Sequence, residues 1–211
     1  MVYTYLDIET TGLSRTDDAP IQFAYLQMED NGIFRKRAAF YINTLCKSWS
    51  ADAEAVHRIS REMLKEHGVE EIRALASMCA IMRSADLVTY NGNAFDIPMI
   101  KNRMQSVGIQ SMYPNSSFDV MTEWQKFHGG RRRKLIDLAK ELGYSEAYIA
   151  GSVKRLFGED GIFRPHDARY DVVETMLVHR KLLEQMNAVR VQEPQPVVQQ
   201  SFVSDVPKLE V

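Results

Sequence analysis

The order of strand-like and helix-like segments constrains the fold of this chain more than any other feature. Its first forty-odd residues are rich in β-branched and aromatic residues, and Asp30-Asn31-Gly32 is a hairpin signal between two of these segments. From Arg61 onward, apolar residues recur at helical spacing instead. Consecutive strands followed by strand–helix units predict an α/β fold whose mixed sheet, an antiparallel meander plus parallel strands, is flanked by helices. The predicted strands are 2–8, 21–28, 34–42 and 86–90.

The composition changes after the last predicted helix. Beyond Asn187 the chain becomes rich in Pro and Gln, which is typical of extended, flexible segments. The sequence therefore predicts one domain over residues 1–187 and a flexible C-terminal tail over residues 188–211. The predicted helices are 61–82, 97–107, 120–127, 135–142, 148–157 and 168–186.

Size and charge narrow the class of protein. At 211 residues and 24.2 kDa the chain can bury one sizeable core. Its net charge of −2 argues against coating nucleic acid by bulk electrostatics, but it permits an enzyme that holds a strand end locally. No apolar run approaches the ~20 residues of a membrane helix, the first residues lack a secretory signal, and Cys46 and Cys79 form no disulfide framework. We therefore expect a cytoplasmic protein with no membrane partner.

Asp7 and Glu9 are the first of three acidic segments. Residues i and i+2 of a strand project from the same face, so these carboxylates lie side by side while Ile8 points into the opposite layer. Like charges this close repel and raise a carboxyl pKa, which a bound cation relieves. Two solvated acids on an edge strand are the alternative, but Thr10-Thr11-Gly12 lets a ligand approach the backbone and favours a site.

Asp96, His166 and Asp171 complete the set. Asp96 precedes Ile97-Pro98 and is also placed to cap a helix. Asp171 lies where a carboxylate stabilises a helix N-terminus, and His166 must come from the preceding loop or the first turn to reach the same water. Four carboxylates suit Mg²⁺ or Mn²⁺, and two such ions can clamp both oxygens of a phosphodiester displacement. The histidine is a proton acceptor that titrates near neutrality.

These segments resemble the three motifs of the DnaQ-like, or DEDD, exonuclease superfamily. Residues 7–13, Asp-Ile-Glu-Thr-Thr-Gly-Leu, resemble the first motif, and residues 91–98, Asn-Gly-Asn-Ala-Phe-Asp-Ile-Pro, resemble the second. His166-x-Ala168-x-x-Asp171 resembles the third motif in its histidine form, since Asp167 stands where the other form has tyrosine. The resemblance covers residues 3–186. The superfamily includes the proofreading subunit of bacterial replicative DNA polymerase.

The resemblance implies an RNase H-like sheet and a role for each motif residue. His166 would be the general base. The implied ligands of two Mg²⁺ or Mn²⁺ ions are Asp7, Glu9, Asp96 and Asp171. The residues implied to contact the terminal nucleotide or its strand are Thr10, Thr11, Leu13 and either Asn91 or Asn93. The implied activity is 3′-to-5′ hydrolysis at a single-stranded or frayed DNA 3′ end, which releases nucleoside 5′-monophosphates in proofreading or repair.

Two other functions stay open at this point. A 3′-to-5′ exoribonuclease or oligoribonuclease of the same superfamily would carry the same motifs, because discrimination of the 2′-hydroxyl depends on pocket shape. A polymerase-associated or clamp-associated binding subunit is an alternative of a different class, although an intact acid set argues against it. Residues 199–203 faintly resemble a clamp-binding peptide, but a disordered linker explains them better.

Three weaker signals lie outside the motifs. His57 resembles a family histidine that approaches the substrate, but it also fits a packing role before the helix opened by Ser60. Arg131 and Arg132 belong to a basic cluster that follows two glycines, which favours contact with phosphates over a merely solvated face. Asp119 matches a recurrent family aspartate and is better explained as a helix cap.

Overall fold

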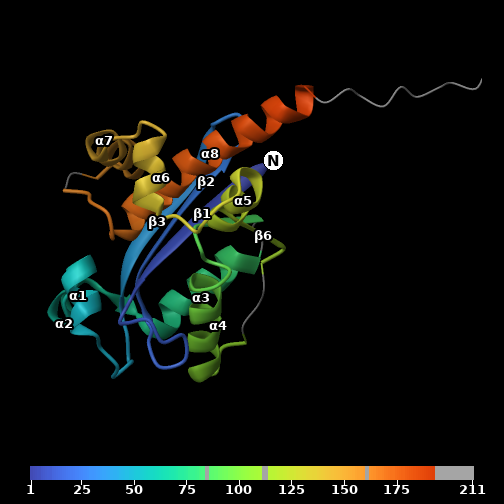
Figure 1. The fold of residues 1–211 in the computed structure, drawn as a ribbon. Coiled ribbons are helices and arrows are strands. Elements are labelled where there is room, and N and C mark those ends of the chain that lie inside the picture. The colour runs from blue at the N-terminus through green and yellow to red at the C-terminus, as the bar shows by residue number, and fades with distance from the viewer. Residues whose placement is uncertain (84–85, 111–113, 160–161, 193–211) are drawn as a thin grey trace, which may run out of the picture.

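A six-stranded mixed sheet forms the centre of the protein in the computed structural model, which describes residues 1–83, 86–110, 114–159 and 162–192 (Figure 1). The strands are β1 (Val2–Thr10), β2 (Pro20–Glu29), β3 (Phe34–Asn43), β4 (Val69–Glu70), β5 (Asp86–Thr89) and β6 (Ser116–Asp119). Their order across the sheet is β4-β3-β2-β1-β5-β6. The first three strands form an antiparallel meander, while β5 runs parallel to β1 and β6, and β4 runs parallel to β3. The predicted α/β fold with a mixed sheet is confirmed.

Helices pack on both faces of this sheet. They are α1 (Ala51–His57), α2 (Arg61–His67), α3 (Glu71–Arg83), α4 (Asp96–Ser106), α5 (Val120–His128), α6 (Leu135–Glu141), α7 (Glu146–Phe157) and α8 (Ala168–Gln192). One core cluster joins the sheet to α5, α6, α7 and α8, and a second joins it to α3 and α4. Figure 1 shows α8 running along the sheet towards the upper right, while α1 and α2 lie at the lower left. Within the described residues, no helix is long and apolar enough to cross a bilayer.

Alternation along β1 assigns the acidic residues to one face. Tyr5 belongs to the core beneath α8, whereas Leu6 and Ile8 belong to the core beneath α3 and α4. Because side chains alternate along a strand, Asp7 and Glu9 share the face of Tyr5 and lie towards the start of α8. Each fully buried side chain of this kind contributes roughly 1.5–3 kcal/mol to folding, so the strand register is strongly specified.

The helical stretch predicted from Arg61 to Met82 is two helices, separated at Gly68. A β-carbon on Gly68 would lie 2.3 Å from the carbonyl oxygen of Leu64 and 2.6 Å from the backbone nitrogen of Asn43. The backbone there is extended, with φ −79° and ψ 140°, so α2 ends and the chain passes through β4 before α3 begins. Tertiary contact with β3, which no local periodicity reports, divides the helix.

Three other segments differ from the sequence-based prediction. The first, α1, was not predicted, because only its last residue, His57, is buried. The short strand β6 was not predicted either, since Ser116 and Ser117 provide no apolar alternation. The last helix continues to Gln192 instead of ending at Met186. The rest of the predicted tail, residues 193–211, lies outside the described residues, so the domain boundary stays a prediction.

Candidate active site

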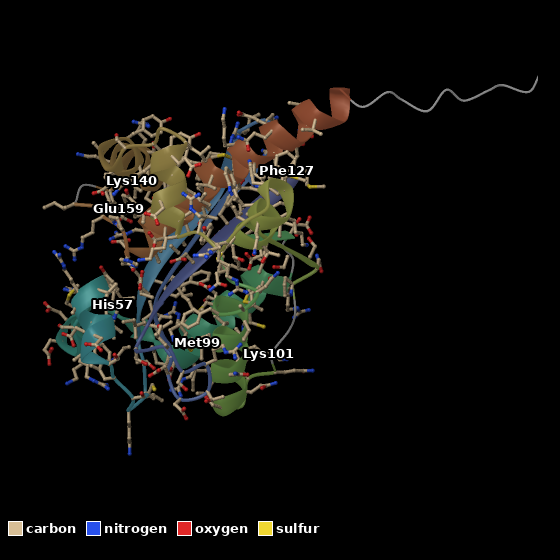
Figure 2. All side chains as sticks on the ribbon, viewed as in Figure 1. His57, Met99, Lys101, Phe127, Lys140 and Glu159 are labelled. Carbon is tan, nitrogen blue, oxygen red and sulfur yellow. The ribbon has the colours of Figure 1, made fainter. Side chains whose placement is uncertain are left out.

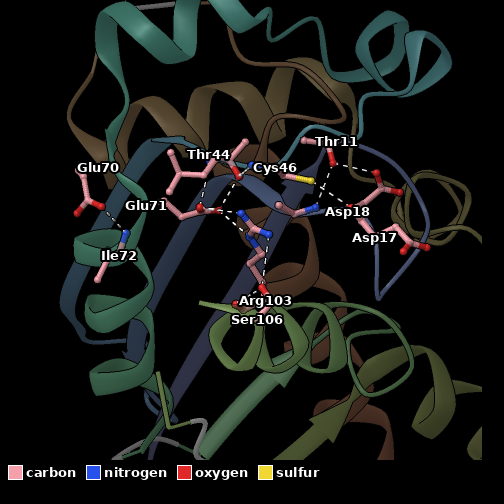
Figure 3. Close-up of polar contacts among 12 residues, drawn as sticks. Thr11, Asp17, Asp18, Thr44, Cys46, Glu70, Glu71, Ile72, Arg103 and Ser106 are labelled. Atoms are coloured by element: carbon pink, nitrogen blue, oxygen red, sulfur yellow. Dashed lines mark hydrogen bonds and ion pairs between the residues drawn. The ribbon is translucent and has the colours of Figure 1, made fainter. Parts of the chain in front are cut away.

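The first motif occupies the end of β1 and the loop that follows. A register irregularity between Glu9 and Thr10 ends the regular pairing with β2. Asp18 then closes the loop, because its carboxylate accepts hydrogen bonds from the Thr11 hydroxyl (3.0 Å), the Ser48 hydroxyl (2.6 Å) and the Ser14 backbone (2.8 Å). Figure 3 shows the contact between Thr11 and Asp18 within the wider polar network of this region.

Two residues of this loop that were predicted to contact the substrate, Thr11 and Leu13, differ in their exposure. A β-carbon on Gly12 would lie 2.5 Å from Asp18 Oδ2, so only glycine fits the closed loop. Leu13 is 84% exposed at its tip, where an apolar side chain is available to a ligand. Thr11 is buried, and its hydroxyl and backbone are bonded to Asp18, Ala19 and Ser50. Thr11 therefore shapes the loop in this structure and does not line the pocket described below.

Asp119 positions the second motif. Its carboxylate accepts hydrogen bonds from the backbone nitrogens of Asn91, Asn93 and Thr122, each at 3.2 Å. The bond to Thr122 confirms the predicted cap of α5. The other two bonds hold a tight turn in which Asn91 has a φ of +62°. The Asn93 side chain accepts a bond from the Ser117 hydroxyl. The structure leaves the choice between Asn91 and Asn93 as the strand contact a prediction.

Asp96 does not cap α4, contrary to the capping role considered from the sequence. Phe95 occupies the cap position and makes no side-chain capping bond. Asp96 is the first helical residue, is only 5% exposed, and receives hydrogen bonding from the backbones of Ile8 and Asp96 itself. Its carboxylate therefore lies against β1, beside the first motif.

The third motif brings His166 to the start of α8. His166 lies in the loop, as predicted, with a left-handed φ of +64°. Its backbone nitrogen donates to Asp171 Oδ1 at 3.3 Å. Gln22 of β2 anchors the same turn, since its Oε1 accepts from the Ala168 nitrogen at 3.0 Å and its Nε2 donates to Asp167 Oδ1 at 3.3 Å. These bonds tie the helix start to the strand beside β1.

Side chains from three distant segments converge here. Glu9, His166 and Asp171 each place a ligand atom within 4.8 Å of the others. Asp7 and Asp96 lie close enough to act electrostatically on this group. Burial, followed by repulsion from Asp171, Asp96 and Glu9, raises the pKa of Asp7 well above its usual value. Three of the five residues predicted to form the site thus lie within 4.8 Å of one another, and the other two, Asp7 and Asp96, interact electrostatically with this group.

The same crowding perturbs the other carboxyl groups and the histidine. Burial and then repulsion from Asp96 raise the pKa of Glu9 to about 8. Burial raises the pKa of Asp96 to about 7, and burial with repulsion from Glu9 raises that of Asp171. Burial, with the nearby positive charge of Lys134, lowers the pKa of His166, so its imidazole is neutral at pH 7.

This donor set fits divalent metal ions. Four carboxylates buried together repel one another, and cations between them would relieve both the repulsion and the loss of hydration. Oxygen ligands suit Mg²⁺ or Mn²⁺. Asp7, Glu9, Asp96 and Asp171 are the residues that would hold them, and none of the four carboxylates is paired with a Lys or Arg in the described parts of the chain.

A pocket of 360 Å³ opens directly beside the acids. Among the predicted residues, Glu9, Thr10, Leu13, His57 and His166 line it, whereas Thr11, Asn91 and Asn93 do not. We refer to it as the nucleotide pocket. The lining residues that the sequence did not suggest are Ile8, Ser50, Asp52, Ala53, Val56 and Phe95.

His57 joins α1 to the first motif. It is 5% exposed, and its Nδ1 accepts from the Ile59 nitrogen at 3.0 Å. Its ring therefore carries a proton on Nε2 when neutral, and burial lowers its pKa. His57 therefore both packs in the interior and lines the pocket. Most of the missed lining residues come from α1 or its cap, and the capping signal, Ser50 before Asp52 and Glu54, is present in the sequence.

The predicted phosphate contacts lie in the loop before α6. Arg131 and Arg132 are exposed there. The Tyr90 hydroxyl donates to the Arg133 carbonyl at 2.6 Å, which holds this loop at the end of β5. Neither Arg131 nor Arg132 lines the nucleotide pocket, although the charge of the neighbouring Lys134 contributes to the lowered pKa of His166.

Comparisons with known proteins agree with this geometry. A family model described as exonuclease, RNase T type, matches residues 4–179. The PolC-type DNA polymerase III of Ureaplasma parvum serovar 3 is 30% identical over 119 residues, which are 56% of this chain. E. coli exonuclease I in complex with a dT13 oligonucleotide has a TM-score of 0.69 at 17% identity, covering 90% of this chain and 42% of that chain. Exonuclease X in complex with 5′ overhanging duplex DNA has a TM-score of 0.63 at 16% identity, covering 88% and 93%.

This chain spans nearly all of exonuclease X but only part of the other two proteins. The match spans 8% of the PolC-type polymerase and less than half of the exonuclease I chain. At 16–17% identity, the structural likeness establishes the RNase H-like fold. This likeness does not show that the present chain binds the same ligands.

Proposed function

Because the chain belongs to the DnaQ-like exonuclease family in its DEDDh form, we propose that it is a metal-dependent 3′-to-5′ exonuclease acting on DNA. The observation that supports this most directly is the approach of Glu9, His166 and Asp171 to within 4.8 Å of one another, with Asp7 and Asp96 beside them. A buried acid cluster open to a pocket of nucleotide dimensions is the arrangement that phosphodiester hydrolysis requires.

Each residue then has a chemical role. Asp7, Glu9, Asp96 and Asp171 would hold two Mg²⁺ or Mn²⁺ ions, whose positive charge would lower the pKa of the attacking water and stabilise the departing 3′-oxyanion. His166, neutral at pH 7, accepts the proton of the attacking water. The hydroxide attacks the terminal phosphorus in line, the bond to the 3′-oxygen of the preceding nucleotide breaks, and a nucleoside 5′-monophosphate leaves.

The pocket and the basic loop position the strand. Leu13 and Phe95 provide apolar surface for the terminal base, while Thr10 and His57 line the pocket near its sugar. Arg131 and Arg132 contact phosphates farther along the strand. The substrate is a single-stranded or frayed DNA 3′ end, in keeping with the oligonucleotide in the exonuclease I structure.

The cellular role follows from the compared proteins and stays a proposal. Similarity to a replicative polymerase of the PolC type supports proofreading, with DNA repair as the alternative. A polymerase or sliding clamp is the proposed partner of the tail, and the cytoplasm is the predicted location. The first test of these partners is co-elution with a polymerase or clamp that is lost when residues 190–211 are deleted.

A degradation assay tests the activity itself. We expect Mg²⁺ or Mn²⁺ to permit stepwise shortening of a 5′-labelled DNA oligonucleotide, a 3′ block to prevent it, and EDTA to abolish it. A matched RNA oligonucleotide should be degraded more slowly; faster RNA degradation would identify an exoribonuclease. Shortening from the 5′ end, or activity in EDTA, would overturn the proposal.

The role of His166 is tested in the same assay. His166→Ala should lower kcat by ~10²–10⁴-fold, the usual contribution of a general base, with metal affinity nearly unchanged. His67→Ala, which changes an exposed histidine of α2, is the matched control and should retain full activity. An unchanged rate in His166→Ala would remove this residue from the proton transfer.

A further inference from the structure

A second pocket, of 140 Å³, shares His57 with the nucleotide pocket. Its other polar lining residues are Gln22, Tyr41, Arg58, Arg164, Asp167 and Arg169. They come from β2, β3, the end of α1 and the segment that leads into α8, so four parts of the chain build it. We refer to it as the arginine pocket. Figure 2 labels His57, which lines both pockets, and Glu159, which pairs with Arg169.

The charges of the arginine pocket do not cancel. Arg169 is neutralised, because its Nε and Nη2 contact Asp167 at 2.9 and 2.7 Å and its Nη1 pairs with Glu159. Arg58 and Arg164 have no hydrogen bond or ion pair from their guanidinium groups to any residue in the described ranges. Three arginines set against Asp167 and Glu159 leave one net positive charge, and the unpaired guanidinium groups of Arg58 and Arg164 each offer several donors.

The backbone at Arg58 gives a second sign that its side chain is used. Arg58 ends α1 with a φ of 61° and a ψ of 28°, in the left-handed region where a helix usually ends with glycine. A side chain there is strained by ~1 kcal/mol or more. Arg58 brings a positive charge next to His57 at a position where glycine would relieve the strain but offer no charge.

Tyr41 adds an uncharged donor to the two arginines. Burial raises the pKa of its hydroxyl, so the group stays protonated. No described residue is hydrogen-bonded to it. Two cationic forks and a hydroxyl facing one small space are complementary to a tetrahedral dianion or to a phosphodiester.

The arginine pocket is adjacent to the acids. Gln22 lines it and is paired with Glu9 across β1 and β2, which places the two on neighbouring strands roughly 4.8 Å apart. Gln22 also holds Asp167, the residue next to His166. A group bound there would therefore lie beside Glu9 and the loop that carries His166.

We propose that the arginine pocket is a phosphate-binding subsite in which Arg58, Arg164 and Tyr41 hold a phosphate group next to the catalytic acids. The phosphate is one of the bound strand or a free phosphate ion, since the recognition chemistry is the same. The inference rests on the proposed function, because the strand is the substrate of that activity.

Neutralising variants test the subsite. Arg58→Gln and Arg164→Gln should raise KM for a DNA oligonucleotide several-fold and leave kcat nearly unchanged, because neither side chain touches the reacting atoms. The slope of log KM against log salt concentration should fall by about 0.7 for each lost contact with a single strand. Arg164→Lys should keep the slope. Arg83→Gln on α3 removes the same charge far from the pocket and is the control.

Two further measurements identify the source of the phosphate and separate the hypotheses. A strand phosphate predicts that one neutral methylphosphonate linkage raises KM for the wild type but not for the double variant Arg58→Gln/Arg164→Gln. A free phosphate predicts that inorganic phosphate binds the wild type, by calorimetry, and not that variant. Both variants behaving like Arg83→Gln in every arm would overturn the subsite. Absence of any degradation by the wild type would overturn the proposed function, while calorimetry would still test the pocket.

Discussion

The acidic residues of the site are costly to fold without a ligand. Glu9 and Asp96 are buried among other carboxylates, and their pKa values rise to about 8 and about 7 for that reason. Asp171 is raised by burial and by repulsion from Glu9. Such a cluster is organised for binding cations and not for stability, which is a common property of functional sites.

Removing one charge should therefore separate stability from activity. Asp171→Asn keeps the shape of the side chain but removes a proposed metal ligand and a source of repulsion. We expect hydrolysis to be lost and the melting temperature in EDTA to rise by ~2–4 °C for each kcal/mol of repulsion relieved. Thermal melts and the oligonucleotide assay measure the two effects. Asp137→Asn, at an exposed position on α6, should change neither, and a destabilised Asp171→Asn would contradict the repulsion.

At the scale of elements, close backbone approaches decide where helices end. Gly68 lies between α2 and β4 because the carbonyl of Leu64 and the backbone of Asn43 leave no room for a β-carbon. Gly151 lies inside α7, and a β-carbon there would meet only the end of the Arg155 side chain, at 3.6 Å. The surroundings of Gly68 therefore require glycine, whereas those of Gly151 leave room for a β-carbon.

Alanine at the two positions should have opposite effects. Gly68→Ala should destabilise the protein by ~1–3 kcal/mol or more, the usual cost of overpacking. Gly151→Ala should stabilise it by ~0.5–1 kcal/mol, because alanine loses less backbone entropy in a helix. Urea denaturation measures both. Equal effects would show that the separation of α2 from α3 is not steric.

A buried ion pair connects the elements around the site. The carboxylate of Glu71, at the start of α3, contacts Nε and Nη2 of Arg103 on α4, both at 2.8 Å (Figure 3). It also accepts bonds from the Thr44 hydroxyl (2.5 Å) and the Leu45 backbone (3.0 Å) after β3. Burial alone would raise the pKa of Glu71, and these bonds hold it below its usual value.

Breaking this pair on one side should be severe. Arg103→Met leaves Glu71 buried without its partner, and we expect a loss of ~3–5 kcal/mol in the free energy of unfolding. Adding Glu71→Leu should recover part of the loss, because the double variant buries no charge. Lys126→Met, which breaks an exposed pair with Glu123, should cost less than ~1 kcal/mol. Denaturant titrations of the four proteins decide the matter, and a small loss for Arg103→Met would refute it.

At the scale of the whole molecule, the acid cluster links stability to pH and to metal. The folded pKa values of Glu9 and Asp96, about 8 and about 7, lie above their ordinary values of 4.5 and 3.8. The folded, metal-free protein therefore binds more protons than the unfolded chain between these limits. This contribution to stability is complete below pH ~4 and is lost as pH rises through 7 to 8.

Metal ions should reverse this dependence. In EDTA, we expect a lower free energy of unfolding at about pH 8.5 than at about pH 5.5. Saturating Mg²⁺ or Mn²⁺ should restore stability most at the higher pH, because metal binds the deprotonated carboxylates. Denaturation at the two pH values, with and without metal, measures it. Stability that rises with pH in EDTA would show that the carboxylates are not crowded.

Prediction from the sequence succeeded where the signal is local or periodic. Alternation in β1 placed Asp7 and Glu9 on one face, and the loop before α8 was the expected source of His166. It failed where the signal is a contact between distant segments. The hydrogen bond from the Thr11 hydroxyl to Asp18, which closes the first-motif loop, was not predicted, and contact between Thr11 and substrate stays a prediction. The role of Gln22, which holds the start of α8, depends on its pairing with Glu9 and leaves no trace in the residues around it.

The amino-acid sequence by itself determined which carboxylates share a face, because residue type and the two-residue period of a strand decide it. The tertiary structure alone decided which other residues surround those carboxylates. The polar helix α1, the break at Gly68 and the arginine pocket exist because segments far apart in the chain pack against one another. Such contacts arise from the packing of the whole sheet and its helices, which no single segment encodes.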